Sequence, residues 1–436
     1  MGERGEAPAG LLGPEAAVLR LLGLWRPRER QGQGLTPPAV VAAATIAAVA
    51  FIPAGVVLRL CGDFPEEIEE TAHCSYICIV CFGCIVKAVL FVMEGDTVRE
   101  LVHLLQATRA EYGSDEGSDR IRSGYQGTVD RMYRYFQVMA LLPTLYWICW
   151  PLVAAAVSPG EASGVSGARQ LPLPFWLPSG ASGTPTYHLL YAVQALSLSL
   201  TVASAVCLDV FFIRLMMMLA AELQVLNENI AAIDGCRASG SAYGREEEEF
   251  DSLVPSDDRA LEPTKKSAAN FSDDDLFSRL LNNILHHQAI LRCIWLLQTA
   301  MNVSIFILLF INMANLCFNM FVTAGLLQDG RNVTKAVTAF SPVPGLLLQT
   351  AMYCLFGQIT TDQSEKLLHS AFGCGWDDCD TRFKHNLLIF MLMVGRPVEI
   401  TVGKTYKLSK EMLLQVLNGT YVLLNMLFHV HSDDHI

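Results

Sequence analysis

The sequence predicts an all-α membrane protein with seven transmembrane helices, a cytoplasmic N-terminus and an extracellular C-terminus. The first supporting observation is composition: of 436 residues, 52% are hydrophobic and 17% are charged, whereas soluble globular domains carry about 25% charged residues. The second is that the charges cluster between apolar runs, and a helix needs roughly 20 apolar residues to cross a bilayer. The third is a regular alternation of basic-rich and basic-poor loops.

Seven apolar runs have the length and composition of transmembrane helices. An eighth run, HNLLIFMLMVG, is too short to cross, and it predicts a re-entrant helix or a helix at the cytoplasmic boundary. The seven predicted spans are Ala39–Leu60, Thr71–Met93, Tyr135–Val157, Tyr187–Leu215, Thr299–Leu326, Phe340–Thr361 and Leu408–Val430.

The loops predict the orientation, because Lys and Arg are concentrated on the cytoplasmic side of membrane proteins. Five Arg precede the first span, six Arg lie between the second and third, seven basic residues lie between the fourth and fifth, and six lie between the sixth and seventh. The alternate loops hold none, one and two basic residues, and the tail holds none. This pattern argues against a rhodopsin-like G-protein-coupled receptor, whose N-terminus is extracellular.

The chain outside the spans also has recognisable parts. Residues 1–38 form a cytoplasmic segment without a signal-peptide pattern, in which Val18–Trp25 predicts an amphipathic helix on the membrane surface. Residues 39–361 hold the first six spans and, at about 236–270, an acidic insert whose charge predicts disorder. The remaining parts are a cytoplasmic anchor region at 362–407, the seventh helix at 408–430 and an extracellular tail at 431–436.

After the acidic insert, the sequence predicts a helix that starts at an N-cap of Ser272 and projects into the cytoplasm. Neighbouring His286 and His287 in this helix point about 100° apart, so we do not expect them to bind one metal ion together. Of four N-x-[ST] sequons, only Asn332 lies in an extracellular loop, and it is the predicted glycosylation site. The apolar positions expected to contact partners are Leu276, Leu280, Ile284, Ile290 and Leu291.

Polar and sulfur-containing residues inside the spans have structural interpretations. Cys74, Cys78 and Cys81 share one face of the second span, which predicts a packing seam of small residues and no metal site. Lys87 lies near the cytoplasmic end of that span, where its amine can reach the interface. Asp209 in the fourth span is costlier, and it predicts either a contact with a basic residue such as Arg214 or a functional position.

The second extracellular loop contains LPLPFWLP and is rich in Pro, Gly and Ser. It is consistent with a flexible lid or with an aromatic-proline cap over the mouth of a cavity, in which Phe175 and Trp176 are the buried part. Both interpretations stay open at this point.

The C-terminal third contains the stretches SAFGCGW, GRPVEITVGKTYKLSK and NGTYVLL. With these motifs it resembles the insect odorant receptors. That family typically ends with a Ser and a Trp some six residues apart, a basic stretch, a short apolar helix, an R-x-x-P-like turn, a T-x-G-K-like run, a Leu-Ser pair and a final helix with a Tyr. The LPLPFWLP loop and YCLFG, Tyr353–Gly357 in the sixth span, are also similar to the family's. The matching residues are Ser370, Trp376, Arg396, Pro397, Thr401, Gly403, Lys404, Leu408, Ser409 and Tyr421.

The resemblance implies a ligand-gated cation channel in the plasma membrane of a sensory dendrite, with four subunits around one pore. An odorant-tuned member is expected to bind volatile organic molecules in the outer half of its helix bundle. It assembles with a shared coreceptor as a heterotetramer or with itself as a homotetramer. The resemblance implies no cofactor, no enzymatic activity and no nucleic-acid partner.

The seventh helix carries two stripes, and only one can face a pore centre. Leu417, Tyr421, Leu424 and Phe428 share one face, and the family's gate corresponds to Leu424. A polar stripe of Gln415, Asn418 and Asn425 lies roughly 100° around the helix. The resemblance favours the apolar face at the gate and the polar stripe at a subunit contact, although the reverse arrangement stays open.

An odorant site needs an apolar, aromatic cavity with few polar groups. The outer half of the third span supplies aromatic residues, and Pro143 and Pro151 are expected to bend that helix and open space there. For each candidate, ordinary helix packing is the competing interpretation. The candidate ligand-binding residues are Cys78, Phe82, Tyr146, Trp147, Trp150, Ser199, Gln349 and Met352.

The main alternatives belong to the same superfamily. A gustatory receptor typically ends in T-Y, five apolar residues and Q-F, whereas this chain reads TYVLLNMLF, with Leu427 in the Gln position. The coreceptor itself has a longer second cytoplasmic loop. A transporter is disfavoured because the chain has no inverted repeat or paired broken helices.

Overall fold

The computed structural model describes residues 11–26, 37–62, 68–112, 115–157, 171–176, 184–246, 273–328 and 333–433. Within these ranges nearly every residue lies in a helix, as the sequence predicted. The helices are α1 Pro14–Leu21, α2 Pro37–Gly62, α3 Ile68–Met93, α4 Gly95–Glu111, α5 Glu116–Val157, α6 Thr184–Glu246, α7 Asp273–Gln328, α8 Val333–Phe340, α9 Val343–Phe372, α10 Thr381–Val394 and α11 Lys410–Asp433. A two-stranded hairpin, β1 Thr401–Val402 and β2 Tyr406–Lys407, precedes α11.

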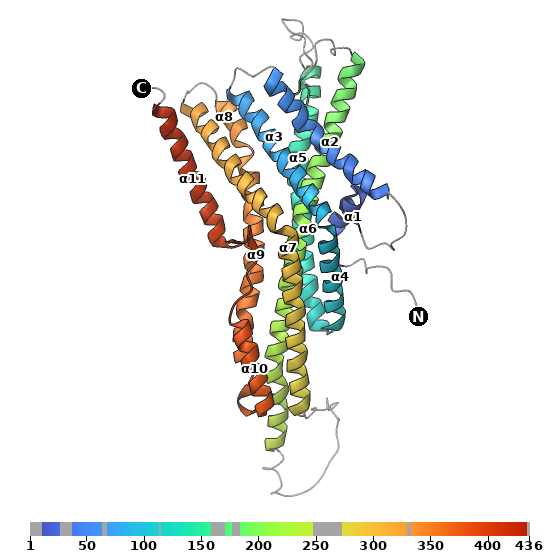
Figure 1. The fold of residues 1–436 in the computed structure, drawn as a ribbon, viewed down its shortest axis with the longest axis vertical. Coiled ribbons are helices and arrows are strands. Elements are labelled where there is room, and N and C mark those ends of the chain that lie inside the picture. Colours follow the sequence, from blue (N-terminus) through green and yellow to red (C-terminus); the bar gives the residue numbers. More distant parts are fainter. Residues whose placement is uncertain are drawn as a thin grey trace, which may run out of the picture.

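Figure 1 shows an elongated bundle in which α2, α3, α5, α6, α7, α9 and α11 all contribute to the upper part. The lower part consists of α4, α10 and the lower ends of α5, α6, α7 and α9. Five of the described helices, α2, α3, α5, α6 and α7, are long and apolar enough to cross a membrane. The sixth and seventh predicted spans correspond to α9 and α11.

The long helices extend well beyond the spans that hydropathy predicts. α6 has 63 residues, which corresponds to about 95 Å and roughly three times the thickness of a bilayer core. α7 has 56 residues and joins the predicted cytoplasmic helix to the fifth span without a break. Hydropathy misses these extensions because it detects only apolar surface. The extensions carry charged residues, some buried and paired, such as Glu222, and others exposed, such as Arg279 and Arg292. α6 ends at Glu246 and thus overlaps the beginning of the acidic insert predicted at about 236–270.

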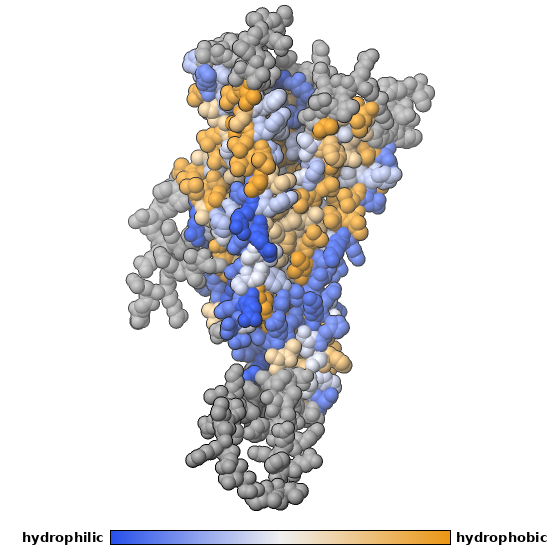
Figure 2. Space-filling view, turned by 180° about the vertical axis from the view of Figure 1, so that it is seen from behind, coloured by the Kyte–Doolittle hydropathy of each residue, from blue (hydrophilic) through white to orange (hydrophobic). Residues whose placement is uncertain are grey.

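The surface follows the same division. Figure 2 shows hydrophobic residues over the upper half of the rear face and mostly hydrophilic residues below them. On α5, large apolar side chains such as Val138, Leu142 and Leu145 are exposed. Since an exposed apolar band of this kind is unfavourable in water, the upper half is the part that fits a bilayer.

α1 differs from its prediction. The helix covers Pro14–Leu21 and is followed by buried Leu22, Leu24 and Trp25, all in the main core. The indole of Trp25 lies against Phe211 of α6, with ring centroids 5.2 Å apart. The apolar residues of this segment therefore pack mostly on the protein's own helices and not on a membrane surface, because α6 offers an aromatic surface that hydropathy does not reveal.

α10 lies at the lower end of the molecule, beside α9 and α7, and is thus well separated from α11 (Figure 1). It begins at Asp380, whose carboxylate accepts a hydrogen bond from the Thr381 amide at 2.6 Å. Phe383, Leu387 and Phe390 bury one face of this helix. The helix is anchored inside the protein through these three residues, and its opposite face is exposed.

Candidate ligand site and pore helix

A hydrophobic cluster near the upper end of the molecule, the upper cluster, joins α2, α3, α5, α6 and the chain between α5 and α6. It combines aliphatic, aromatic and sulfur-containing side chains, and the Trp147 ring meets the His73 ring edge-on at 5.3 Å. Such a composition suits a small apolar ligand. Its buried members are Ile52, Val56, Cys74, Ile77, Cys81, Leu173 and Leu198, and the partly buried ones are Leu60, Tyr76, Cys78, Trp147, Ile148 and Val202.

Residues 171–176, the lid segment, lie across this cluster. Phe175 stacks on Phe51 with ring centroids 5.1 Å apart. The ring passes so close to Gly55 that a Cβ at that position would lie 1.7 Å from it. The segment is therefore a packed cap. The buried residue is Leu173, however, whereas Phe175 is half-buried and Trp176 exposed, because the bare backbone of Gly55 lets the Phe175 ring lie on the surface of α2.

One face of α6 is buried here and carries polar residues at helical spacing. Gln194, Ser197, Thr201 and Ser204 are all buried. The Thr201 hydroxyl donates to the Ser197 carbonyl at 2.8 Å, and the Ser204 hydroxyl donates to the Thr201 carbonyl at 2.9 Å. The two hydroxyls are thus satisfied by their own helix. Gln194 has no such local partner, and its amide nitrogen donates to the Leu173 carbonyl at 3.5 Å.

The predicted ligand-binding residues do not form one site. Cys78 and Trp147 belong to the upper cluster. Tyr146 and Trp150 stack on each other at 5.6 Å and are exposed on the outside of α5. The remaining four lie elsewhere: Phe82 and Ser199 are exposed, Gln349 lies in a buried polar network, and Met352 lines a cleft between α5 and α9.

That cleft has a volume of about 390 Å³ and a mostly apolar lining. Arg131 lines this cleft. Among the described residues, its guanidinium donates hydrogen bonds to its own helix, to the Gly127 carbonyl and the Thr128 hydroxyl at 3.4 Å each. Leu348 and Met352 of α9 face Met132, Tyr135 and Phe136 of α5 across it. The cleft is wide open, unlike the covered upper cluster.

Below the upper cluster, Asp209 of α6 is the centre of the Asp209 network. Its carboxylate accepts hydrogen bonds from Lys87 of α3, from Tyr353 at 2.5 Å and from Gln349 at 2.7 Å. Gln349 in turn accepts from the Asn312 amide of α7 at 3.1 Å. The network therefore joins four helices, α3, α6, α7 and α9, through one carboxylate.

This arrangement corrects two expectations. Lys87 is only 2% exposed and pairs with Asp209, so its amine does not extend to the membrane interface. Arg214 is not the partner of Asp209, because it pairs with Glu15 of α1 and Asp130 of α5. A buried carboxylate needs several donors at once, and the packing of α3 and α9 supplies them from residues distant in sequence.

The hairpin before α11 is fixed to α7 and α9. Its turn contains two residues in the left-handed region, Gly403 and Lys404, and the Lys404 amide donates to the Asn302 side chain of α7 at 3.2 Å. Tyr406 stacks on Phe306 of α7 with centroids 5.9 Å apart. On the other side, a Cβ at Gly357 of α9 would lie 2.4 Å from the Cβ of Leu408. The YCLFG and Leu-Ser motifs thus meet at this point.

α11 itself contacts the rest of the bundle along one face, where Val416 and Thr420 are buried. Ser409 begins the helix by accepting from the Met412 amide at 3.2 Å. Leu417 and Tyr421 are exposed and Leu424 is half-buried. The polar residues Gln415, Asn418 and Asn425 are also exposed, so the two stripes are both accessible in one subunit, whereas the side chain of Phe428 lies outside the described residues.

A family model described as 7tm Odorant receptor matches residues 67–421, which is most of the sequence. The chain belongs to the odorant receptor family. The resemblance seen in its C-terminal third is thus confirmed, and since the family consists of receptors, the chain is not an enzyme. The match includes α3 to α10, the hairpin and half of α11.

Sequence similarity to individual odorant receptors is partial. The receptor is 23% identical to Odorant receptor 59b of Drosophila melanogaster over 173 residues, 38% of this chain and 39% of that protein. It is 31% identical to Odorant receptor 10 of Aedes albopictus over 71 residues, 16% of this chain and 19% of that protein. The matched regions thus span two-fifths or less of these relatives.

Similarity of fold covers nearly the whole receptor. Two structures of the olfactory receptor OR5 from Machilis hrabei, one in complex with eugenol, superimpose with TM-scores of 0.69 and 0.70. Each comparison covers 95% of this chain and 97% of the other, at 13% and 14% sequence identity. The seven-helix membrane fold is therefore confirmed.

Glu222 is the centre of a second buried network, the Glu222 network, in the lower part of the receptor. It accepts from Arg109 at 2.7 Å and from Arg122 at 2.8 and 3.0 Å. His286 lies 3.5 Å from the same carboxylate and stacks on Tyr112. Burial lowers the pKa of Arg109, while the charge of Glu222 opposes that shift. Four helices, α4 to α7, are joined here.

The two neighbouring histidines of α7 point to different partners. His286 faces Glu222 and Tyr112, whereas His287 meets the Phe390 ring of α10 edge-on at 5.5 Å. No group of three or more His, Cys, Asp or Glu side chains arranged for metal binding occurs among the described residues. His286 and His287 thus take part in two separate packing contacts.

Two functional features were missed by sequence reasoning although signals existed. The run YAVQALSLSLTVAS places a polar residue about every third position within an apolar span, which is the spacing of one helical face. The run FFIRLMMMLAAELQVL is largely apolar and has Arg214 and Glu222 as its only charged residues, which indicates charges buried with partners. Predicted sites at Asn332 and Ser272 lie outside the described residues.

Proposed function

We propose that this receptor is the odorant-tuned subunit of a ligand-gated, non-selective cation channel in the plasma membrane. Small volatile organic molecules bind in the upper, extracellular half and open a pore lined by α11 from four subunits. The observation that carries the proposal is the attachment of α11, which contacts its own bundle along a single face and leaves large apolar side chains such as Leu414, Tyr421 and Met426 exposed.

An isolated helix of this kind would be unfavourable in either water or lipid. The exposed residues Gln415, Asn418 and Asn425 are costly in lipid without partners, and the exposed leucines are costly in water. Copies of α11 around a central pore satisfy both, because amides can bond between helices and apolar residues can form a constriction that dewets. We assign Leu417, Tyr421, Leu424 and Phe428 to that constriction.

The upper cluster is the proposed odorant site. It is apolar, contains Trp147 and Cys78, and is covered by the lid segment. Eugenol, which is bound by OR5 of Machilis hrabei, is a small aromatic molecule and belongs to the class of volatile organic ligands proposed here. Tyr146, Trp150, Phe82, Ser199, Gln349 and Met352 remain candidates only for contacts that form when helices shift.

A contiguous set of contacts supports coupling between this site and the pore. Asp209 on α6 connects to Gln349 on α9 and from there to Asn312 on α7. About two to three turns below Asn312, α7 holds the hairpin through Phe306 and Asn302. A shift of α6 or α9 on ligand binding would therefore move the support on which α11 begins. Such a path is an inference from contact, and its test is energetic coupling.

The same reading assigns the surroundings of the channel. The loop containing Asn332 is extracellular, and Asn332 is the proposed glycosylation site. The N-terminus is cytoplasmic. The partners are an odorant receptor coreceptor in a heterotetramer, or further copies of this chain. The sensory dendrite is the proposed location.

The deciding experiment is whole-cell recording from non-insect cells that express the receptor with and without an insect coreceptor, exposed to a panel of volatiles that includes eugenol. Odorant-evoked cation current only with the coreceptor supports the proposal. Current without it indicates a homomeric channel and favours a gustatory-type or coreceptor-type subunit. Surface-expressed protein that stays silent in both conditions contradicts the ligand class.

The pore assignment has its own test. Leu424→Ala truncates a side chain of the proposed constriction and widens it. We expect a several-fold rise in current without odorant, since a wider apolar ring dewets less readily. Leu392→Ala, which truncates an exposed leucine of α10, is the matched control. Unchanged resting current in Leu424→Ala at normal surface expression would remove this residue from the gate.

A further inference from the structure

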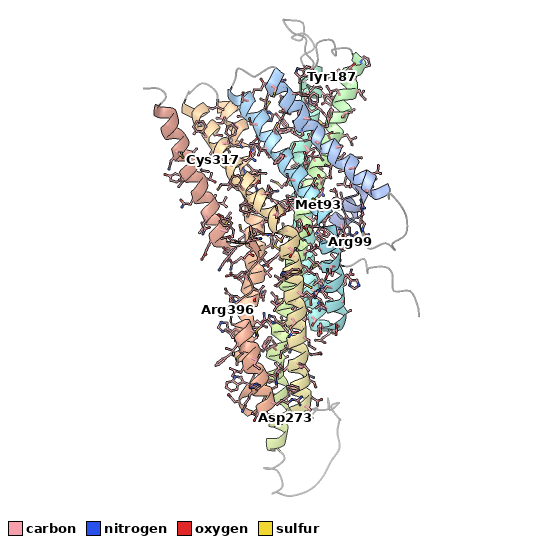
Figure 3. All side chains as sticks on the ribbon, in the orientation of Figure 1. Met93, Arg99, Tyr187, Asp273, Cys317 and Arg396 are labelled. Atoms are coloured by element: carbon pink, nitrogen blue, oxygen red, sulfur yellow. The ribbon has the colours of Figure 1, made fainter. Side chains whose placement is uncertain are left out.

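The amide of Gln194 is the one polar side-chain group of the α6 face in the upper cluster that keeps an unsatisfied atom among the described residues. Gln194 is fully buried, and its Oε1 has no hydrogen-bond partner there. It lies seven residues, about two turns, below Tyr187, which Figure 3 labels at the upper end of α6. Leaving a buried acceptor unpaired is unfavourable, so the position calls for a donor.

The orientation of this amide follows from its neighbour. Gln194 Nε2 lies 3.5 Å from the Leu173 carbonyl oxygen. The opposite orientation would bring Oε1 against that carbonyl, with two acceptors facing each other and no proton between them. The carbonyl of the lid segment therefore holds the nitrogen, and the oxygen is left as an acceptor.

Nearby side chains do not supply the missing proton. Thr201 and Ser204, about two and three turns below, donate to carbonyls of their own helix. Ser197, one turn below, does not donate to Oε1 either.

The upper cluster around the neighbouring positions Leu173 and Leu198 is mainly aliphatic, aromatic and thiol side chains. Its two other donors, the Tyr76 hydroxyl and the Trp147 indole, do not bond Oε1. An acceptor in such surroundings distinguishes ligands strongly, because water is largely excluded from competing for it.

We infer that Gln194 is a specificity-determining residue whose Oε1 accepts a hydrogen bond from the hydroxyl group of the ligand, so that the receptor prefers volatile alcohols and phenols to ketones of the same shape. This inference rests on the proposed odorant site in the upper cluster. A ketone presents only an acceptor, which would meet Oε1 without a proton and leave both groups unpaired.

Space for the ligand comes from the lid segment. Leu173, fully packed in the upper cluster, belongs to this segment. The segment's polar contacts with the helices are long: 3.5 Å from Gln194 and 3.4 Å from the Trp176 amide to the Gly55 carbonyl. Bonds of this length are weak. The end of the lid segment at Trp176 is the part that yields when a ligand enters, while the Leu173 carbonyl keeps the Gln194 amide in its orientation.

The test compares 2-octanol with 2-octanone, two volatiles of nearly equal size that differ in donor capacity. Affinity is measured by tryptophan fluorescence of the purified full-length receptor, and potency by whole-cell current. We expect the alcohol to bind about tenfold more tightly, as one net hydrogen bond of roughly 1 to 1.5 kcal/mol predicts. Gln194→Met keeps the length of the side chain but removes the acceptor, and we expect it to bind both probes equally.

Leu196→Met introduces the same side chain on the exposed face of α6 and should keep the tenfold preference. Equal affinity of both probes in the unmodified receptor overturns the inference. Equal weakening of both probes in Gln194→Met also overturns it, because it reveals a purely structural role. Preferential binding of the alcohol without any evoked current would instead support Gln194 and contradict the channel function.

Discussion

The upper cluster and the Asp209 network lie on the same helices but are held together by opposite means. Asp209 is fifteen residues beyond Gln194 on α6, about 22 Å further along the helix. Apolar contacts hold the upper cluster, and long hydrogen bonds hold its lid segment. The Asp209 network instead has one carboxylate with donors from two other helices.

The difference indicates a division of labour. Apolar contacts are non-directional, so a cluster of them can rearrange around ligands of different shapes with modest change in free energy. A buried charged network loses its stabilisation when any one partner moves, so it favours discrete arrangements. The upper part is thus suited to accommodate ligands, and the Asp209 network is suited to report their presence as a shift between helices.

The largest effect is expected from removing the carboxylate at the centre of the network. Asp209→Leu leaves the Lys87 ammonium, which is 2% exposed, without a counter-charge. An unpaired buried charge destabilises a protein by about 3 to 5 kcal/mol. We expect reduced surface expression and a lower thermal unfolding midpoint, measured by fluorescence-detected size-exclusion after heating.

The double variant Lys87→Met with Asp209→Leu removes both charges and should recover most of the lost stability. Its response to odorant should remain impaired, because α3 and α9 are no longer connected through the carboxylate. A single variant Asp209→Leu with an unchanged unfolding midpoint would show that the two regions do not differ in the way described.

A second, smaller effect is expected where α9, which carries Gln349 and Tyr353 of the Asp209 network, meets the segment before α11. In Gly357→Ala the new methyl group would lie 2.4 Å from the Leu408 Cβ and 2.7 Å from its carbonyl oxygen. Overpacking of this kind costs about 1 to 3 kcal/mol. We expect a lower unfolding midpoint and an altered resting current, since Leu408 lies two residues before α11.

Gly345→Ala is the matched control for this change. It makes the same substitution in the same helix, α9, where a Cβ would have no neighbour within 4 Å. The control should unfold at the same temperature as the unmodified receptor or slightly above it, because Ala is the better helix former. Identical unfolding midpoints and resting currents in the two variants would show that the contact between Gly357 and Leu408 does not link α9 to α11.

The sequence predicted the parts of this fold that depend on local pattern. Apolar length and basic loops indicated the helices, and the residues around Gly357, Leu408 and Lys404 indicated the family. The partners of buried charges were beyond it. Lys87 and Tyr353 contact Asp209 across 122 and 144 positions of sequence. The sequence around each residue does not indicate that Asp209 is its partner. The same applies to Gln194, whose importance depends on the lid segment that covers it.

The smallest effect is expected in the upper region, at the contact between the lid segment and α2. In Gly55→Ala the methyl group would lie 1.7 Å from the Phe175 ring, so the ring must leave its stacking position on Phe51. Global stability should change little, because Phe175 is only half-buried. Weaker docking of the lid segment should instead ease access of odorants to the upper cluster. The gain in apparent affinity is limited to the free energy of contacts such as the Trp176 hydrogen bond, about 1 kcal/mol. This corresponds to a fall of about fivefold in the half-maximal odorant concentration.

The matched control is Gly83→Ala, where a Cβ would make an ordinary contact of 3.4 Å with Ile311. It should leave the dependence of the current on odorant concentration unchanged. A higher half-maximal concentration in Gly55→Ala would mean that the Phe175 ring contributes to odorant binding and is not a barrier to odorant entry.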